Sequence, residues 1–165
     1  MYNEHIVKLG GANMEHTKTY NAIELKTKHG SLILEGPVSS EDIARLDFHK
    51  DLVAFRPPAQ QHKAITEIAK LPEGRILIAL DNFTIVGYVT YLYPDPLERW
   101  SKGQMENLIE LGAIEVIPKF RGSGVGKGLL KVSMMDDMME DYITITTEYY
   151  WHWDLKGTGL NVWEY

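Results

Sequence analysis

Residues 121–128 combine glycines and basic side chains at a point where a predicted strand gives way to a predicted helix. They read Arg-Gly-Ser-Gly-Val-Gly-Lys-Gly and follow Pro118. Glycines at such a turn allow successive backbone N–H groups to point at one spot, and the positive end of the helix dipole adds to their field. The turn therefore predicts a binding site for an anion such as a phosphate group.

Two well-known phosphate-binding motifs match this turn poorly. A Walker A loop requires glycine at position 121 and a hydroxyl residue at 128, where Arg121 and Gly128 stand. A dinucleotide fingerprint that starts at Gly122 would need a third glycine where Lys127 stands. Glu148 ends the next predicted strand, about where an acid that binds a ribose would lie. The dinucleotide alternative therefore stays open.

A third pattern is Arg or Gln, two residues, Gly, one residue, then Gly or Ala, and Arg121, Gly124 and Gly126 match it. Here the chain resembles the GNAT superfamily of N-acetyltransferases, in which this turn holds the pyrophosphate of acetyl-CoA. The resemblance implies acetyl-CoA as co-substrate and no metal. The cofactor-binding residues that it implies in the turn are Arg121, Gly122, Ser123, Gly124, Val125, Gly126 and Lys127.

The same resemblance implies a gap between two strands. The strand 108–117 would separate from the strand 142–147, leaving the backbone of Ile114, Glu115 and Val116 for the pantetheine arm of acetyl-CoA. Gly112, in the middle of the first strand, suggests a bulge there, although a simple kink is an alternative.

Transfer of an acetyl group to an amine requires a base, because an unperturbed lysine amine has a pKa of about 10.4. The chain has no cysteine, which excludes an acyl-cysteine intermediate and favours direct attack in a ternary complex. Glu110 and Glu115 are the carboxylates on the strand. In related histone acetyltransferases a catalytic glutamate stands at a fixed distance before the glycine motif, and that distance leads to Glu110.

Other roles in the site stay open at this stage. A structural or solvated carboxylate is the alternative interpretation of Glu110. The candidates to protonate the departing thiolate are Tyr149, Tyr150 and Tyr165, which are equally compatible with packing.

Charge excludes some partners and favours others. The chain carries 17 Lys and Arg against 23 Asp and Glu, a formal charge of −6, and shows no basic stripe for nucleic acid. Asp95, Glu98 and Glu106 precede the strand of Glu110, which favours a cationic acceptor, although such acids are often only a solvated surface. His49, His62 and His152 are scattered without metal-binding spacing, so no metal is expected.

The overall composition predicts one packed domain. Hydrophobic residues make up 44% of the 165 residues, and no apolar run is long enough to span a membrane. The lack of cysteine and of a signal peptide predicts a cytoplasmic protein. We expect residues 1–13 to be a flexible N-terminal extension and residues 14–165 to form the acetyltransferase domain.

The order of predicted elements indicates the fold class. Strands are expected over 31–34, 75–80, 84–93, 108–117 and 142–147. Helices are expected to begin at Ser39, at Pro57-Pro58 and after Gly124, the last one running to about Glu140. This order predicts an α/β protein with a mixed, mostly antiparallel central sheet and flanking helices, the GNAT fold.

A closer resemblance covers the chain from Met14 to Tyr165. The chain is similar to a family of protein lysine acetyltransferases from the acetoin metabolism of Bacillus-type bacteria. The segments that carry this likeness are 18–22, 51–58, 93–100 and 146–159. The likeness implies a partner and substrate, the AMP-forming acetyl-CoA synthetase, which acetylation switches off.

Members of that family continue beyond the point where this chain stops. We therefore expect a sheet without the C-terminal strands of the family fold, or one whose edge a partner chain completes. A catalytically weak, acyl-CoA-binding regulatory partner of the synthetase is the second hypothesis.

Overall fold

The computed structural model describes residues 14–148, 155–161 and 163. Its seven strands form one sheet in the order β1-β2-β4-β5-β6-β7, and β3 pairs with β5. The strands are β1 (Asn21–Thr27), β2 (Gly30–Gly36), β3 (Asp47–Phe48), β4 (Arg75–Asp81), β5 (Thr84–Leu92), β6 (Leu108–Val116) and β7 (Ile143–Ile145). The helices are α1 (Ser40–Arg45), α2 (Pro58–Lys70), α3 (Val125–Ser133) and α4 (Leu155–Thr158), with short 3-10 helices η1 (Arg99–Gly103), η2 (Pro118–Phe120) and η3 (Asp137–Asp141).

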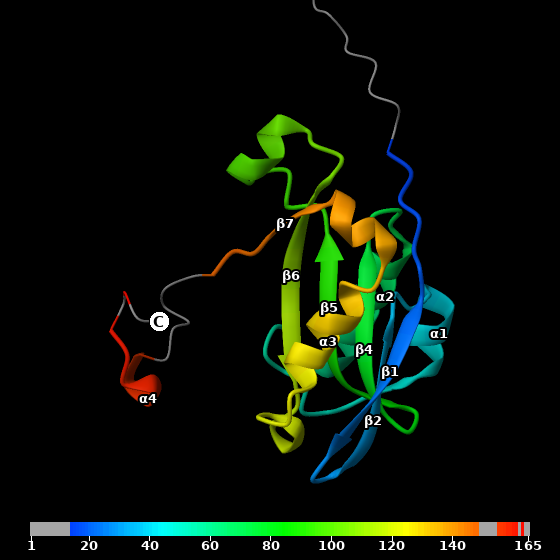
Figure 1. Ribbon diagram of the computed structural model, residues 1–165, viewed down its shortest axis with the longest axis vertical. Coiled ribbons are helices and arrows are strands. Elements are labelled where there is room, and N and C mark those ends of the chain that lie inside the picture. The colour runs from blue at the N-terminus through cyan, green and yellow to red at the C-terminus, as the bar shows by residue number, and fades with distance from the viewer. Residues whose placement is uncertain (1–13, 149–154, 162, 164–165) are drawn as a thin grey trace, which may run out of the picture.

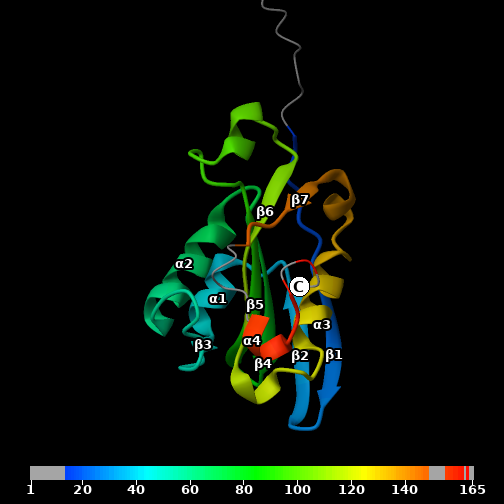
Figure 2. The ribbon, with the colours of Figure 1, turned by 90° about the vertical axis from the view of Figure 1, so that its left-hand side faces the viewer.

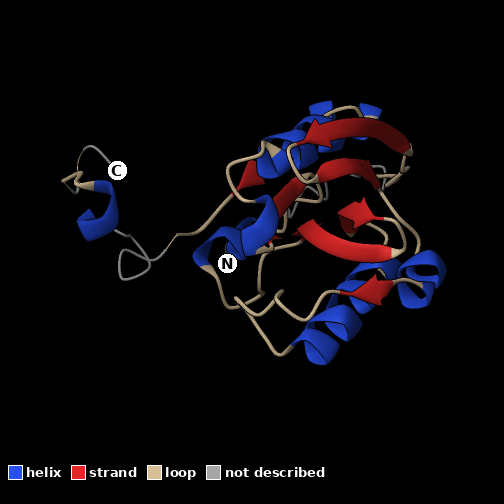
Figure 3. Ribbon diagram, turned by 90° about the horizontal axis from the view of Figure 1, so that it is seen from below, coloured by secondary structure: helices blue, strands red, loops and turns tan. Residues whose placement is uncertain are grey.

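Helices cover both faces of the sheet. Figure 1 shows α3 in front of β4 and β5, and Figure 2 shows α1 and α2 on the opposite side. The view from below in Figure 3 shows the strands between these two layers. Only the β3–β5 and β6–β7 pairs are parallel among the described strands. The predicted α/β class with a mixed, mostly antiparallel sheet is confirmed.

The helices on the rear face begin where their capping residues predict. The Ser39 side chain accepts a hydrogen bond from the Asp42 N–H and caps α1. Pro58 opens α2, whose first turn has no need of a proline N–H, and the helix ends before Pro72. Ile43 and Ile65 are fully buried from these two helices, so they pack the rear face of the sheet.

The centre of the sheet is the predicted hairpin of β4 and β5. Every residue from Ile76 to Ala79 is completely buried, because helices cover both faces of this strand. β5 then pairs with β6, and the register shifts at one point: Thr90 lies opposite Ala113, whereas Tyr91 lies opposite Leu111. Gly112 is therefore the extra residue of a β-bulge, as its position predicts.

The strand predicted over 31–34 is present as part of β2, whereas its partner β1 was not predicted. β1 and β2 form a hairpin in full register from Asn21–Gly36 to Thr27–Gly30. The alternation of Ile23 and Leu25 with charged neighbours is the signal that could have predicted β1.

The prediction that the third helix runs to about Glu140 is wrong. α3 ends at Ser133, and η3 follows. The reason is Asp136, which is fully buried, pairs with Arg75 at 2.9 Å and caps the Met138 N–H. A side chain that binds both a buried cation and the local backbone competes with helix continuation.

Some expectations concern residues outside the described part of the chain. These are the N-terminal extension 1–13 and the three tyrosines Tyr149, Tyr150 and Tyr165.

Candidate functional site

β6 and β7 form a fork. They pair in parallel over three positions only, from Leu108–Ile143 to Glu110–Ile145, and β7 ends there while β6 continues to Val116. The chain between them runs through the glycine turn and α3, so the turn lies at the open end of the fork, as Figure 1 shows. The separation predicted for these two strands is present.

The fork exposes particular backbone groups of β6. Ile117 N–H donates to the Val86 carbonyl, and alternation along the ladder directs the backbone of Glu115 toward Tyr88 of β5. The backbone of Ile114 and of Val116 therefore faces the fork. Of the three predicted positions, Ile114 and Val116 thus face the fork, where the Val116 carbonyl accepts a hydrogen bond from Arg121 Nε, whereas Glu115 faces β5.

The side chain of Glu115 anchors a loop on the rear face. It is 5% exposed, and its two oxygens accept hydrogen bonds from the Tyr88 hydroxyl and from the Ala54 N–H, each at 2.8 Å. Burial and the neighbouring carboxylate raise the pKa of Tyr88. Glu115 therefore ties the connection between β3 and α2 to the strand. No local sequence pattern predicts the two partners of its carboxylate.

The glycine turn has the conformation of an anion cradle. Gly122 and Gly124 have φ of +73° and +85°, a region that favours glycine, and a Cβ on either would meet no atom within 4 Å. The amides of Gly124, Val125 and Gly126 have no hydrogen-bond acceptor in the part of the chain that the structure describes. The same holds for the amides of Gly122 and Lys127. These N–H groups surround the N-terminus of α3, so the turn can bind an anion.

Two side chains of the turn have separate positions. Arg121 is exposed, and its Nε donates to the Val116 carbonyl at 2.9 Å, which fixes the turn to the end of β6. Ser123 uses its N–H in a turn bond to the Phe120 carbonyl at 3.3 Å. Arg121 therefore braces the cradle from the fork side.

Glu110 lies at the closed end of the fork. It is half-buried and pairs with Leu92 on one side and Ile145 on the other. Burial raises the pKa of its carboxyl group, and the negative charges of Glu98 and Asp95 raise it further, against a hydrogen bond from Thr147 that lowers it. A carboxylate with a raised pKa is a better proton acceptor, as a general base must be.

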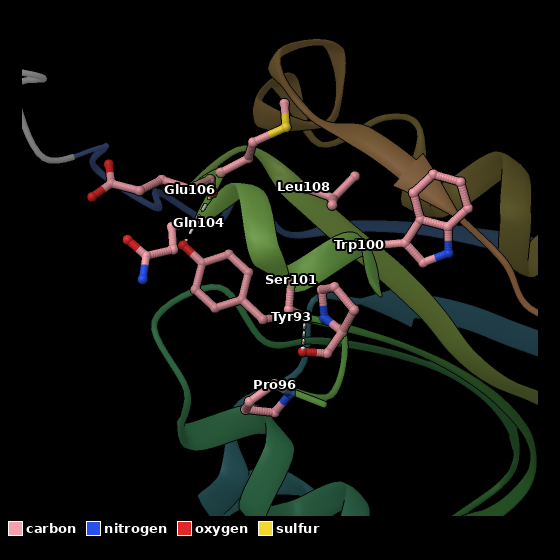
Figure 4. Close-up of a pocket in the computed structure, with 9 residues that line it drawn as sticks. Tyr93, Pro96, Trp100, Ser101, Gln104, Glu106 and Leu108 are labelled. Carbon is pink, nitrogen blue, oxygen red and sulfur yellow. Dashed lines mark hydrogen bonds between the residues drawn. The ribbon is translucent and has the colours of Figure 1, made fainter. Parts of the chain in front are cut away.

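A cavity of about 450 Å³ lies beside the start of β6, in the connection from β5 that contains η1. It is lined by Tyr93, Pro94, Pro96, Trp100, Ser101, Gln104, Met105, Glu106 and Leu108. Two hydrogen bonds hold this wall in Figure 4: Tyr93 donates to the Glu106 carbonyl at 3.0 Å, and Ser101 to the Pro94 carbonyl at 3.2 Å. The predicted acids Asp95, Glu98 and Glu106 all belong to this connection, which ends where β6 begins at Leu108, two residues before Glu110.

A second cavity, of about 320 Å³, lies on the rear face at the bulge. Its lining includes Phe55 and Arg56 from the loop that Glu115 anchors, together with Leu92 and Gly112. The Arg56 guanidinium donates to the Gln61 side-chain carbonyl at 3.0 Å. The strand of Glu110 therefore borders both cavities, the first at Leu108 and the second at the bulge.

The described residues contain neither a grouped set of metal ligands nor a membrane-spanning helix. No three His, Asp or Glu side chains are grouped closely enough to hold a metal ion within residues 14–148, 155–161 and 163. In the same part of the chain, no helix has the length and apolar character needed to cross a membrane.

Comparison with known proteins agrees with this geometry. The model of the acetyltransferase (GNAT) family matches residues 45–154. The acetoin utilization protein AcuA of Bacillus subtilis (strain 168) is 70% identical over 152 residues, which cover 92% of this chain and 72% of that protein.

Solved structures give the same picture. The crystal structure of an acetoin utilization protein from Exiguobacterium sibiricum 255-15 has a TM-score of 0.82 and 55% identity, over 89% of this chain and 70% of that one. An aminoglycoside acetyltransferase from an uncultured soil metagenomic sample has a TM-score of 0.51 and 14% identity, over 78% of this chain and 84% of that one. The second likeness concerns the fold alone.

Proposed function

This chain belongs to the GNAT family of acetyltransferases, and from that premise we propose that it is an acetyl-CoA-dependent lysine N-acetyltransferase acting on a protein. The observation that carries the proposal is the fork: a cradle of open amides lies at one end and a carboxylate of raised pKa at the other. Residues 14–165 would form the catalytic domain, and the cytoplasm would be its compartment.

The dimensions of the fork fit a long, anionic thioester. The six residue steps from Glu110 to Val116 span about 20 Å. A ligand that reaches from the cradle to Glu110 must join an anionic group to a reacting group through an extended arm. Acetyl-CoA has this form: its pyrophosphate would accept hydrogen bonds from the amides of residues 122–127, and its pantetheine arm would pair with the backbone of Ile114 and Val116.

Glu110 would act as the base. Its carboxylate would take a proton from the acceptor ammonium group, and the neutral amine would then attack the thioester carbonyl. A C–N bond forms, the C–S bond breaks, and the thiolate of CoA leaves and takes up a proton. The closed end of the fork would bring both reactants together beside Glu110, which favours direct transfer.

The acceptor lysine would enter from the side of the 450 Å³ cavity. Asp95 and Glu98 lie close enough to raise the pKa of Glu110, so they would also attract an ammonium group before it reaches the base. The net charge of −6 favours the same kind of acceptor.

We propose the AMP-forming acetyl-CoA synthetase as the acceptor protein. The support is the 70% identity of the chain to AcuA, an acetoin utilization protein, together with the family likeness of segments 18–22, 51–58, 93–100 and 146–159, which implies this substrate. Acetylation of a lysine removes its positive charge, and loss of a charge that a synthetase needs for catalysis would lower its activity.

Two measurements test the proposal and separate it from its alternative. Calorimetric titration with acetyl-CoA reports binding, and intact-mass spectrometry of the synthetase reports transfer after incubation with the chain and acetyl-CoA. Binding with added acetyl groups supports the enzyme. Binding without added mass would favour the regulatory partner, and an affinity for NAD instead would revive the dinucleotide alternative.

A further inference from the structure

His16 lies where three separate segments meet. Its Nε2 lies 2.8 Å from the hydroxyl of Tyr93, and its Nδ1 is hydrogen-bonded to the hydroxyl of Tyr142. Its ring stacks on Tyr142 at a centroid distance of 5.8 Å and meets Tyr93 edge-on at 5.7 Å. We propose that His16 is a positioning residue that fixes the closed end of the fork, an inference that rests on the proposed function.

One arrangement of protons satisfies the whole network. Arg75 can only donate, and it donates to the Tyr142 oxygen at 3.1 Å. In this arrangement the Tyr142 hydroxyl donates to Nδ1 of His16, and Nε2–H donates to the Tyr93 oxygen. Tyr93 in turn donates to the Glu106 carbonyl, which can only accept. A neutral His16 protonated on Nε2 thus satisfies every member of the network.

One end of this network is held rigidly. Arg75 is completely buried on β4 and pairs with the equally buried Asp136 at 2.9 Å. Its Nη2 also donates to the Thr17 carbonyl at 2.6 Å, next to His16. The segment that contains His16 and Thr17 is therefore attached to β4, at the centre of the sheet.

The hydrogen-bond network of His16 reaches the residues just before the two fork strands, directly through Tyr142 and, through Tyr93, at Glu106. Tyr142 directly precedes β7, and Glu106 is two residues before β6. Ile143 N–H donates to the Asn107 carbonyl at 2.7 Å, at the point where the strands meet. His16 bridges the two starting points, so loss of its hydrogen bonds should let β7 shift relative to Glu110 and change the width of the fork.

The test substitutes His16→Phe, which keeps an aromatic ring and removes both hydrogen bonds. We expect the KM for acetyl-CoA to rise about tenfold, because small displacements in an active site cost that much or more. His16→Gln, which retains a donor, should recover part of the loss. In the His16→Phe background, Tyr93→Phe should raise the KM by a smaller factor than it does in the wild type, because the bond between the two residues is already lost and only the Tyr93–Glu106 bond remains to be removed.

The matched control is His62→Phe. His62 is also half-buried and stacks on an aromatic ring, Phe48, with a centroid distance of 5.3 Å. It belongs to α2 and is hydrogen-bonded to the Ile43 carbonyl of α1 at 2.8 Å, away from the fork. This variant should leave the KM for acetyl-CoA within twofold. A KM that responds equally to both variants would show a general effect of stability and overturn the positioning role.

Hydrogen exchange keeps the inference separate from the proposed function. The amides of Ile143–Ile145 should exchange at least tenfold faster in His16→Phe than in the wild type and should be unchanged in His62→Phe. Absence of acetyl transfer by the wild-type chain would refute the proposed function. Unchanged exchange of these amides in His16→Phe would refute the positioning role of His16.

Discussion

Glu110 and Ile145 are the last aligned pair of β6 and β7, and beyond this pair the two strands separate. The carboxylate therefore lies at the closed end of the fork, and the glycine turn lies at its open end. Since Glu110 also pairs with Leu92, its backbone is held on both sides. A base that must meet an amine at a defined distance requires such a fixed position at the closed end of the fork.

Replacement of the proposed base should remove turnover while binding is kept. Glu110→Gln preserves the size of the side chain and its place in the sheet, so acetyl-CoA should bind with unchanged affinity in a calorimetric titration. The acetylation rate near pH 7 should fall by roughly 100-fold or more, the usual contribution of a general base. Comparable rates for the two forms would exclude Glu110 from this role.

The pH dependence of the reaction should carry the mark of Glu110. Burial raises the pKa of its carboxyl group, so the acidic limb of the kcat profile should lie above the range of an ordinary glutamate, about 4.3. Asp95→Asn removes one of the charges that raise this pKa and should move the limb to lower pH. A limb that does not move would show that a group far from Asp95 controls the rate.

The same pKa predicts how stability depends on pH. The folded chain binds the proton of Glu110 more tightly than the unfolded chain does, so the favourable contribution of this group is complete below about pH 4.3 and is lost as the pH rises through the folded pKa. Glu110→Gln should therefore have a higher Tm than the wild type near pH 7, and the two should converge near pH 4. A lower Tm for the variant at both pH values would contradict this assignment.

Two alanine substitutions should separate the conformation of the cradle from its composition. Gly124 has φ of +85°, so Gly124→Ala should lower the stability by about 1–3 kcal/mol and weaken the binding of acetyl-CoA. Gly126 has an ordinary helical φ, and a Cβ there would meet Ile114 at 3.8 Å, a normal contact. Gly126→Ala should keep both properties, as thermal melts and calorimetry can establish; equal losses in both variants would exclude backbone strain as the cause.

Loss of the buried pair Arg75–Asp136 should lower the stability of the fold strongly. Asp136→Ala leaves a buried guanidinium without its counter-charge and should lower the free energy of unfolding by about 3–5 kcal/mol. The exposed pair Lys70–Glu67 is the control, and its loss should change stability by less than about 1 kcal/mol. Denaturant titrations of the two variants that gave equal values would argue against a buried ion pair.

Much of the fold could be predicted from local sequence signals. Pro58 and Ser39 mark helix starts because a missing N–H and a capping hydroxyl suit those positions, and Gly112 marks the bulge because the chain needs an extra residue there. The end of α3 was predicted wrongly because the cause, a pair between Asp136 and Arg75, joins residues 61 positions apart. Interactions of that range leave no local pattern.

The candidate site shows the same division. The glycine turn has a local signature, so its conformation could be predicted from residues 121–126. The role of the Glu115 side chain could not, because its partners Tyr88 and Ala54 come from a neighbouring strand and a distant loop. His16 belongs to the same class: it has no motif, and only the fold brings it between Tyr93 and Tyr142.

The measurement that tests the central claim most directly is the intact mass of purified AMP-forming acetyl-CoA synthetase after incubation with this chain and acetyl-CoA, beside an identical reaction with Glu110→Gln. The proposed mechanism predicts a gain of acetyl mass with the wild-type chain and almost none with the variant. No gain with the wild-type chain, or an equal gain with both, would contradict it.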